Sequence, residues 1–590
     1  MKLILICCIG FLTFGAGIGF SQWSTDPSVN SGVCMTAGDQ QYPQMISDGV
    51  GGGIIAWWDY RNDASHSDIY AQRINAAGIR QWLNGSDSNG IPVCTAAYNQ
   101  FFPVLAGDGK GGVIMAWLDD RSGLGTEIYA QRISFAGIAE WQAGGVPICS
   151  GVSNSACNME TIVSDGAGGA IISWQDERAG GATARHIYAQ RIDSSGTVRW
   201  AVNGVALTSV SAQFSPASAA DGSGGALISW SDYRNGSDYD LYMQRIDSSG
   251  HAQWADGGIA VCPAVHDQIN PSILADGRGG GIVAWEDSRS SYNGTDHTIY
   301  AQHIGGSGSR LWIVNGDSSG VPVCTNNSGD QLFNSASDPR HRIMVSDGAG
   351  GAIIVWQENR IYAQRLDSTG ARLWGGTGDT NGVVLNNRPY YQYDPDIIAT
   401  GSGTAIVTWW NSSDRHIYAQ SIDGSGTLLW TIGGAVVGAA PGTQSCPVMI
   451  GNGGRGAIIT WQDRRNGSDY DIFTQNINSD GVLTHVGASP PFSALPAETE
   501  LYQNYPDPFN PSTRIRYQLP YASRVTVRVY NLLGGVVATL FSGIVDAGER
   551  EISWNASNVP GGVYFCRLTA ASLDNPLRTA SRTMKMILMK

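Results

Sequence analysis

The chain has 590 residues, more than one ordinary hydrophobic core holds, so its length excludes a single small domain. Its 77 glycines, 19 tryptophans and 23 tyrosines, with only 15% charged residues, are typical of a turn-rich β protein rather than a helical or disordered chain. The net charge is −14, and residues 501–590 hold ten Lys and Arg against five Asp and Glu, so the rest is strongly acidic. An acidic body repels phosphate backbones, and we therefore expect no nucleic-acid partner.

The first predicted element is a secretory signal peptide over residues 1–22. One Lys precedes an apolar run from Leu3 to Phe20, and small and polar residues follow it. An N-terminal membrane anchor is the alternative, because the run is nearly long enough to span a bilayer. The glycines inside the run favour cleavage. No other stretch is long and apolar enough to span, so we predict a protein without a stable membrane span.

Residues 23–486 repeat one pattern eight times, with the first Trp of each copy at Trp57, Trp117, Trp174, Trp230, Trp285, Trp356, Trp409 and Trp461. The first copy contains four short β-type runs: Pro43–Ser47, Gly53–Trp57, Asp68–Ile74 and Gly90–Cys94. An Asp-Gly-x-Gly-Gly turn joins the first two, since glycine allows the positive φ that such a turn needs. Each copy therefore predicts four antiparallel strands.

Eight four-stranded repeats predict an all-β, eight-bladed β-propeller. An open solenoid is the rival, and a seven-bladed or irregular ring is the other alternative. The chain ends favour closure, because the first recognisable element, Ser31–Gly38, matches a fourth strand, whereas the last copy stops after its third. The N-terminal strand would then complete the final blade and remove two free edges.

Most copies carry a Trp-x-Asp-x-Arg group whose alternate residues share one face of a strand. A ring of carboxylates for catalysis or cation binding is one interpretation. The other interpretation is a structural clamp that is repeated in each blade. We favour the clamp because a catalytic constellation normally occurs once in a protein, whereas this group recurs in most copies. Unit six has the variant Glu358/Arg360, and unit seven breaks the pattern with Asn411. The predicted clamp residues are Asp59, Arg61, Asp119, Arg121, Asp176, Arg178, Asp232, Arg234, Asp287, Arg289, Asp463 and Arg465.

Two loops place carboxylates at alternate positions that could hold Ca²⁺, namely Asp238 with Asp240 and Asp469 with Asp471. The spacing of an EF-hand is absent, and Asn-Gly with Asp is also ordinary hairpin chemistry. We therefore predict no cofactor, with Ca²⁺ as the alternative.

Five cysteines fall at the end of the fourth strand: Cys34, Cys94, Cys149, Cys262 and Cys324. Equivalent positions on different blades should lie beyond the reach of a disulfide, so we interpret these residues as small buried hydrophobes. Cys157 and Cys446 precede first strands, and Cys566 lies in the tail. The chain has no Cys-x-x-Cys pair, which makes zinc an unfavoured ligand.

After a Pro-rich linker at residues 487–500, residues 501–590 show six β-type runs, which predict a small Ig-like β-sandwich. Four separated motifs stand in this tail: NYPDPFNPST at Asn504–Thr513, VYNLLGGVV at Val529–Val537, GGVYF at Gly561–Phe565 and KMILMK at Lys585–Lys590. Together they resemble the type A C-terminal sorting domain of type IX secretion substrates. The motif residues that carry the resemblance are Asn504, Tyr505, Pro506, Pro508, Phe509, Asn510, Pro511, Gly561, Tyr564 and Lys585. One departure is Asp507, where the family often has Asn.

The resemblance implies export to the periplasm and recognition of the folded tail by the outer-membrane translocon. It further implies that a sorting protease removes the tail and that the cargo is released or tethered at the cell surface. The expected partners are thus this translocon, its protease and an extracellular ligand.

The repeats contain no metalloprotease, nucleophile-elbow or nucleotide-binding motif, which favours a non-catalytic scaffold that binds an extracellular polymer, glycan or protein. A polysaccharide hydrolase or lyase is the alternative, and its site should appear as one unit that departs from its siblings. The departures are Ser291–Thr298 in unit five, and Asn326–Arg342 with a shortened loop in unit six. Length variation in loops is also ordinary.

Overall fold

The computed structural model describes residues 23–151, 157–178, 180, 184–208, 212–291, 296–324, 342–375, 382–388, 390–401, 403–483, 499–519, 523–545, 548–557, 559–572 and 579–589. The predicted signal peptide, nearly all of the linker and the unit-six segment before Arg342 lie outside these residues. The chain divides into two compact units, Met1–Gly487 and Ala488–Lys590. No helix in the described ranges is long and apolar enough to cross a membrane.

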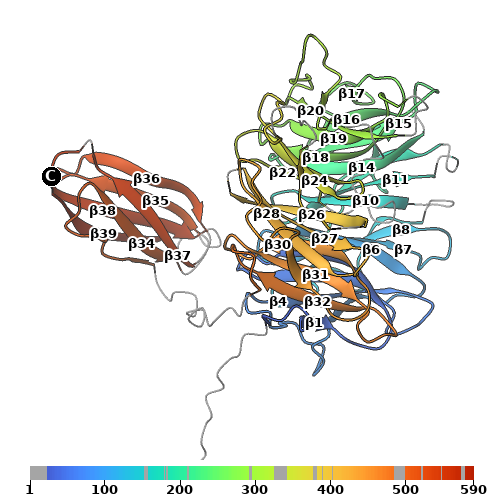
Figure 1. The fold of residues 1–590 in the computed structure, drawn as a ribbon, viewed down its shortest axis with the longest axis horizontal. Helices are drawn as coiled ribbons and strands as arrows, with labels where there is room; N and C mark the ends of the chain where they lie inside the picture. The colour runs from blue at the N-terminus through green and yellow to red at the C-terminus, as the bar shows by residue number, and fades with distance from the viewer. Residues whose placement is uncertain are drawn as a thin grey trace, which may run out of the picture. The chain divides into compact units, whose positions relative to one another are not determined.

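The first unit contains eight four-stranded antiparallel sheets, here called blades 1 to 8 in chain order (Figure 1). Blades 1 and 2 comprise β2 (Gln40–Ser47), β3 (Gly53–Asp59), β4 (Asp68–Ile74) and β5 (Ile91–Cys94), then β6 (Gln100–Gly107), β7 (Val113–Asp119), β8 (Glu127–Ile133) and β9 (Val146–Cys149). Blades 3 and 4 comprise β10 (Cys157–Ser164), β11 (Ala170–Asp176), β12 (His186–Ile192) and β13 (Val205–Ala206), then β14 (Gln213–Ala220), β15 (Ala226–Asp232), β16 (Asp240–Ile246) and β17 (Ile259–Cys262).

The second half of the ring repeats this order. Blades 5 and 6 comprise β18 (Gln268–Ala275), β19 (Gly281–Asp287), β20 (Thr298–Ile304) and β21 (Val321–Pro322), then β22 (Met344–Ser346), β23 (Ala352–Gln357), β24 (Ile361–Leu366) and β25 (Val383–Val384). Blades 7 and 8 comprise β26 (Gln392–Gly401), β27 (Thr404–Asn411), β28 (Ile417–Ile422) and β29 (Ala435–Gly438), then β30 (Gln444–Gly451), β31 (Ala457–Asp463), β32 (Asp471–Ile477) and the N-terminal β1 (Ser31–Cys34).

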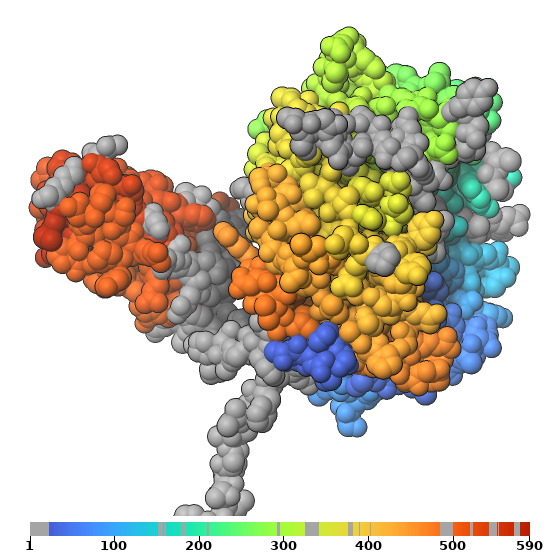
Figure 2. Space-filling view, in the orientation of Figure 1, coloured from blue at the N-terminus to red at the C-terminus, as the bar shows by residue number. Residues whose placement is uncertain are grey.

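The N-terminal strand closes the ring, as predicted. Strand β1 pairs antiparallel with β32, with Ser31 opposite Thr474 and Cys34 opposite Ile472. Figure 2 shows the dark blue N-terminal residues against the orange strands of blade 8. The first strands of successive blades contact one another around the ring, and β30 of blade 8 contacts β2 of blade 1. These contacts exclude the open solenoid and establish the predicted eight-bladed propeller.

A second ring of tryptophans joins the blades. The Trp that follows the third strand in blades 1 to 7 donates its Nε1–H to a backbone carbonyl of the next blade, as Trp82 does to Phe135 at 3.0 Å. It also covers a glycine there, because a Cβ on Gly137 would lie 2.7 Å from the Trp82 ring. The eight tryptophans are Trp23, Trp82, Trp141, Trp200, Trp254, Trp312, Trp374 and Trp430. Trp23 thus supplies to blade 8 the Trp that its own repeat lacks, a role that the repeat pattern did not predict.

The antiparallel order of each blade gives the ring two faces. The turns after the first and third strands lie at one end of the blade. The loop after the second strand and the connection to the next blade lie at the other end, which we call the loop face. Buried Ile, Val, Ala and Trp side chains of neighbouring blades form the cores between the sheets. The variable loops are therefore presented together on the loop face.

The second unit is a small β-sandwich, as predicted. One sheet has the order β33 (Glu500–Leu501), β34 (Ser512–Leu519) and β37 (Gly548–Asn555). The other has the order β36 (Val536–Val545), β35 (Ser523–Tyr530), β38 (Gly562–Ser572) and β39 (Thr579–Leu588). Alternate residues of both sheets, such as Ile515 and Val527, are buried in one shared core.

Candidate functional site

The Trp-x-Asp-x-Arg group of each regular blade forms a closed set of hydrogen bonds. In blade 2, Asp119 Oδ2 accepts from Trp117 Nε1 at 2.8 Å and from Arg121 Nη2 at 2.5 Å, and Asp119 Oδ1 accepts the Arg121 backbone N–H at 2.9 Å. The Arg121 Nη2 also donates to the Gly144 carbonyl at 2.8 Å and lies 3.0 Å from Cys94 Sγ of blade 1. One guanidinium therefore joins three segments and two blades.

The same pairing recurs for all twelve residues of the predicted clamp. The Arg–Asp distances lie between 2.5 and 2.6 Å in the pairs Arg61–Asp59, Arg121–Asp119, Arg178–Asp176, Arg234–Asp232, Arg289–Asp287 and Arg465–Asp463. Each Asp side chain is fully buried. Because their oxygens already accept several N–H groups, these carboxylates offer little to a cation or substrate. This geometry supports the clamp interpretation over a ring of catalytic acids.

Blades 6 and 7 depart from this arrangement. In blade 6, Glu358 takes the Asp position, and its backbone N–H bonds to the Arg360 carbonyl at 2.9 Å, which closes a tight turn. Burial raises the pKa of Glu358. In both blades the Trp on the second strand, Trp356 or Trp409, has a buried Nε1–H with no hydrogen-bond partner in the described chain. The acceptor that satisfies this indole elsewhere is therefore lost here.

An arginine from another segment replaces the missing clamp arginine of blade 7. Arg388 lies in the connection between β25 and β26, and its Nε donates to the Gly433 carbonyl at 3.0 Å. Its guanidinium carbon lies 4.0 Å from the centroid of the Tyr418 ring. In blade 2, Arg121 makes the matching bond to Gly144 and lies 3.7 Å from the Tyr129 ring. In the sequence, the only sign of this replacement is that Arg388 stands in the connection just before copy seven, the copy that lacks the clamp arginine. The repeat pattern did not single out this residue.

A pocket opens beside this replacement, on the loop face. Its volume is ≈ 150 Å³, and its lining residues are Asn359, Arg360, Arg388, Tyr390 and Tyr391. The tight turn of blade 6 contributes the first two, and the following connection contributes the other three. Tyr390 and Tyr391 are 69% and 57% exposed. The pocket thus combines two guanidinium groups with two exposed aromatic rings. None of its five lining residues carries a carboxylate, but Arg388 Nη1 lies 3.9 Å from Asp414 Oδ2 beside the pocket.

The residues considered for Ca²⁺ lie in hydrogen-bonded loop turns. Asn235 Nδ2 donates to Asp238 and, at 2.9 Å, to Asp240. Burial and the neighbouring Asp238 raise the pKa of Asp240 to about 6. In blade 8, burial and the charge of Asp469 raise the pKa of Asp471 to about 7. These contacts fit ordinary turn chemistry, and Ca²⁺ binding stays an untested alternative.

Bulges at the loop-face end of the first strands line the inner mouth of the ring. In blades 1, 2, 4, 5, 7 and 8 the bulge has a residue of positive φ before the repeated Pro: Tyr42, Phe102, Ser215, Asn270, Asp394 and Cys446. In blades 1 and 2, Tyr42 and Phe102 both pack on Trp58, with ring centroids 4.5 Å away in each case. These aromatic side chains cover one another, which favours a packing role at this mouth.

In the second unit, the first and last sorting motifs lie together. The Phe509 N–H donates to the Ile587 carbonyl, and the Met589 N–H donates to the Phe509 carbonyl, both at 2.9 Å. Phe509 is buried against Trp554, with ring centroids 5.4 Å apart. Asp507, which stands where the family often has Asn, accepts the Ile587 N–H through Oδ1 at 2.8 Å. An Asn oxygen could accept the same bond, so this departure changes little.

The other motif residues support the same corner or the strand beside it. Asn504 Nδ2 donates to the Pro506 carbonyl at 3.0 Å and to Thr513 Oγ1 at 2.9 Å. The Tyr564 hydroxyl donates to the Pro560 carbonyl at 2.6 Å. The Lys585 carbonyl accepts from Gln503 Nε2 at 2.8 Å. The remaining positions of the motif set are Tyr505, Pro508, Asn510, Pro511 and Gly561, on the same segments.

The chain as a whole matches no curated protein. Similar solved structures include a puromycin-hydrolyzing peptidase of Mycobacterium tuberculosis, with 11% identity, a TM-score of 0.38, and coverage of 75% of this chain and 61% of the peptidase. The BP39L lectin of Burkholderia pseudomallei has 10% identity and a TM-score of 0.41, with coverage of 68% and 99%. The polysaccharide lyase Uly1 has 10% identity and a TM-score of 0.38, with coverage of 66% and 91%.

These similarities do not carry the activities of those proteins to this chain, which spans only 61% of the peptidase's length. The tail gives a more specific result. Residues 503–575 match the family described as "Secretion system C-terminal sorting domain". This range includes three of the four motifs identified in the sequence. The chain therefore carries a type IX secretion C-terminal sorting domain behind its β-propeller, and the protein is exported to the cell surface or beyond.

Proposed function

We propose that the propeller is a non-catalytic binding module that holds an acidic extracellular polymer or glycan at the pocket of blades 6 and 7. The observation that carries the proposal is the coincidence of the broken clamp with this pocket. In the regular blades the clamp Arg binds the buried Asp, whereas in blade 6 Arg360, at the same repeat position, lines this pocket with Tyr390 and Tyr391.

The chemistry of the lining suits a sugar with a carboxylate or sulfate group. Planar guanidinium groups bind such anions through paired hydrogen bonds. Exposed tyrosines offer an apolar ring face and a hydroxyl at little cost in conformational entropy. The volume of ≈ 150 Å³ lies below the roughly 300–1,000 Å³ of pockets that enclose drug-sized ligands. The pocket would therefore hold one unit of a polymer rather than enclose a whole ligand.

A polysaccharide hydrolase or lyase is the second candidate, and Glu358 favours it. This carboxyl group precedes the lining residue Asn359 in the chain, and burial raises its pKa, as a general acid requires. Glycoside hydrolysis, however, ordinarily uses two carboxyl groups that flank the scissile bond. The pocket lining supplies none, which is why we place binding before catalysis.

The tail would deliver this module to its site of action. We propose that the type IX translocon recognises the folded sandwich and that the sorting protease then removes it. The contact between the first and last motifs supports recognition of the folded tail, because residues from both ends of the sandwich form one surface only after folding.

A polysaccharide panel tests the proposed function on the full chain. Saturable binding to a uronic-acid or sulfated polymer, weakened by salt and absent for a neutral polymer of similar length, is the expected result. Release of reducing ends or unsaturated products by the same protein would overturn the non-catalytic proposal in favour of the second candidate. Binding that ignores the charge of the polymer would count against the pocket's arginines as its determinant.

A further inference from the structure

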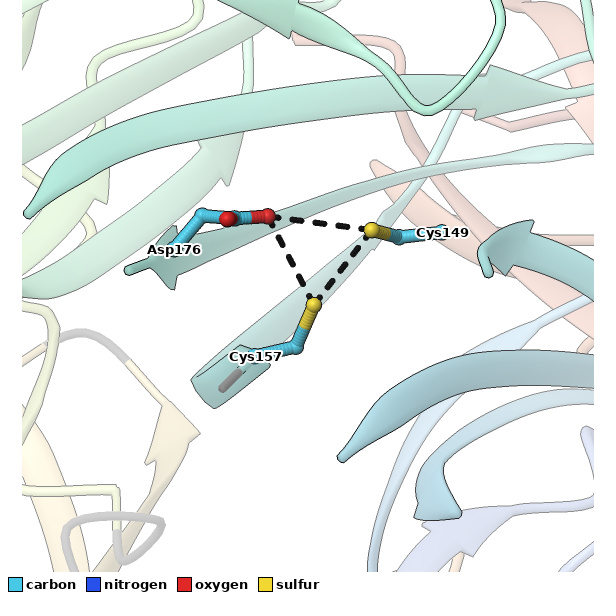
Figure 3. A group of neighbouring side chains, drawn as sticks. All are labelled: Cys149, Cys157 and Asp176. Carbon is cyan, nitrogen blue, oxygen red and sulfur yellow. Dashed lines mark hydrogen bonds between the residues drawn. The ribbon is translucent and has the colours of Figure 1, made fainter. Parts of the chain in front are cut away.

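Two cysteines of neighbouring blades lie in direct contact (Figure 3). Cys149 ends β9 of blade 2, and Cys157 begins β10 of blade 3. Their Sγ atoms are 3.4 Å apart, and both side chains are buried. Each sulfur also lies near Asp176 Oδ2, at 3.7 Å for Cys149 and 3.6 Å for Cys157. The contact is between different positions of the repeat, so the distance argument against pairing of equivalent cysteines does not apply.

At the position of Cys157, blade 3 departs from the six other blades whose first-strand start the structure describes. The first strand of six other blades begins with a glutamine: Gln40, Gln100, Gln213, Gln268, Gln392 and Gln444. In five of them the side-chain amide donates to carbonyls of the preceding connection, as Gln100 does to Ala97 and Tyr98 at 3.2 Å. A thiol lacks the two N–H donors of an amide. Cys157 therefore gives up this means of ordering the connection.

We propose that Cys149 and Cys157 form a disulfide bond in the exported protein. The bond would fasten the connection between blades 2 and 3 covalently, in place of the glutamine's hydrogen bonds. Export places the folding chain in an oxidising compartment, where such bonds form and persist. Closing the pair requires the Sγ–Sγ distance to fall from 3.4 Å to the roughly 2.05 Å of a disulfide, a shift within reach of side-chain rotation.

The reaction is thiol–disulfide exchange with a disulfide oxidant, either a small molecule or a protein. One cysteine thiolate attacks the oxidant's disulfide, forms a mixed disulfide and releases one thiolate. The second cysteine thiolate attacks the mixed disulfide, forms the Cys149–Cys157 bond and releases the second thiolate. The two cysteines are oxidised by two electrons, the oxidant is reduced to two thiols, and the two cysteine protons pass to solvent or to the released thiolates. Since both sulfurs are buried in the folded protein, the exchange would take place during folding.

A metal is the competing occupant of this cluster, since two sulfurs and a carboxylate oxygen converge there. Asp176 Oδ2, however, already accepts from Trp174 Nε1 at 2.9 Å and from Arg178 Nη2 at 2.5 Å. Arg178 Nη2 also lies 3.1 Å from Cys149 Sγ. A divalent cation would have to displace or repel this guanidinium, whereas a neutral disulfide would leave the clamp of blade 3 intact.

Peptide mapping tests the proposal without any mutation. Trypsin should release residues 133–178 as one peptide whose only cysteines are Cys149 and Cys157. The full chain is exported to an oxidising periplasm, denatured and alkylated before digestion. We expect this peptide without alkyl groups, two hydrogens lighter than its dithiol form, and doubly alkylated once a reductant is added first. Double alkylation without reductant, a link to another cysteine, or stoichiometric zinc with both thiols free would each overturn the proposal.

Two variants check the structural consequence. Reductant should lower the melting temperature of the wild type but not that of Cys149→Ser/Cys157→Ser. Cys94→Ser is the matched control, because Cys94 occupies the same strand end in blade 1 but is followed by Gln100. Its melting temperature should still fall with reductant. An equal response to reductant in the double variant and the wild type would contradict a bond at this position.

Discussion

The regular blades and blades 6 and 7 share the same fold, but they differ in the residue at the Asp position of the Trp-x-Asp-x-Arg group. In blades 1 to 5 and 8 a buried Asp accepts both an indole N–H and a guanidinium. In blades 6 and 7 that Asp is Glu358 or Asn411, and the indole is left without a partner in the described chain. The pocket lies at the same place. The repeated residues therefore indicate what holds the ring together, and the interruption marks where we propose the binding site.

The largest expected effect concerns closure, which all blades share. We expect Trp23→Ala to destabilise the propeller by about 4 kcal/mol, since a fully buried Trp is lost from the N-terminal segment that completes blade 8. Urea unfolding measures this. Val29→Ala, at an exposed position of the same segment, is the control and should change stability by less than about 0.5 kcal/mol. Equal, small effects would show that the N-terminal segment is not needed for closure.

The clamp itself is the next test of the comparison. Asp119→Ala leaves the Arg121 guanidinium and the Trp117 indole without their acceptor, so we expect a loss of about 3 kcal/mol. Asp256→Ala, at an exposed position, should cost less than about 0.5 kcal/mol. If the two variants unfold at the same urea concentration, the clamp does not stabilise the ring, and its carboxylates need another explanation.

A smaller effect is expected in the pocket, on binding rather than stability. Arg360→Ala should weaken binding of an acidic polysaccharide about tenfold, which corresponds to the loss of about 1.4 kcal/mol from one charged hydrogen-bonding group. The melting temperature should not move. Arg455→Ala makes the same charge change on the opposite end of blade 8 and should bind like the wild type. Equal weakening by both variants would indicate a general charge effect instead of a site.

The smallest effect concerns pH. The pKa of Asp471 is raised to about 7 in the folded protein. The carboxyl group therefore binds its proton more tightly in the folded state than in the unfolded state. Its contribution to stability is then lost as pH rises from about 4, the unfolded value, to about 7. Asp471→Asn should stabilise the protein at pH 8 by less than about 1 kcal/mol, and the gain should vanish near pH 4. A gain that is the same at both pH values would show that the carboxyl does not titrate differently on folding.

The sequence alone predicted the architecture, because the repeat carries its strands and turns in order and the misplaced fourth strand requires a partner in the last copy. It also predicted the tail, whose motifs are local. It did not predict Trp23 as a member of the second Trp ring, because Trp23 stands before a lone fourth strand and lacks the third strand that precedes the other seven tryptophans. The role of Arg388 was also missed. Arg388 comes from a different segment and takes the place of the missing clamp arginine of blade 7, and only the three-dimensional structure shows that the two positions coincide. The contact between Cys149 and Cys157 likewise depends on how two blades approach each other.

The interrupted blades carry the proposed binding site, and one titration tests this claim most directly. Wild type, Tyr390→Ala/Tyr391→Ala and Tyr98→Ala are titrated with an acidic polysaccharide. Tyr98 is an exposed Tyr with positive φ, two residues before the first-strand Gln in blade 2, as Tyr390 is in blade 7. We expect the double variant alone to lose binding, with all three proteins equally stable. Unchanged binding by the double variant would contradict a binding site at the interrupted blades.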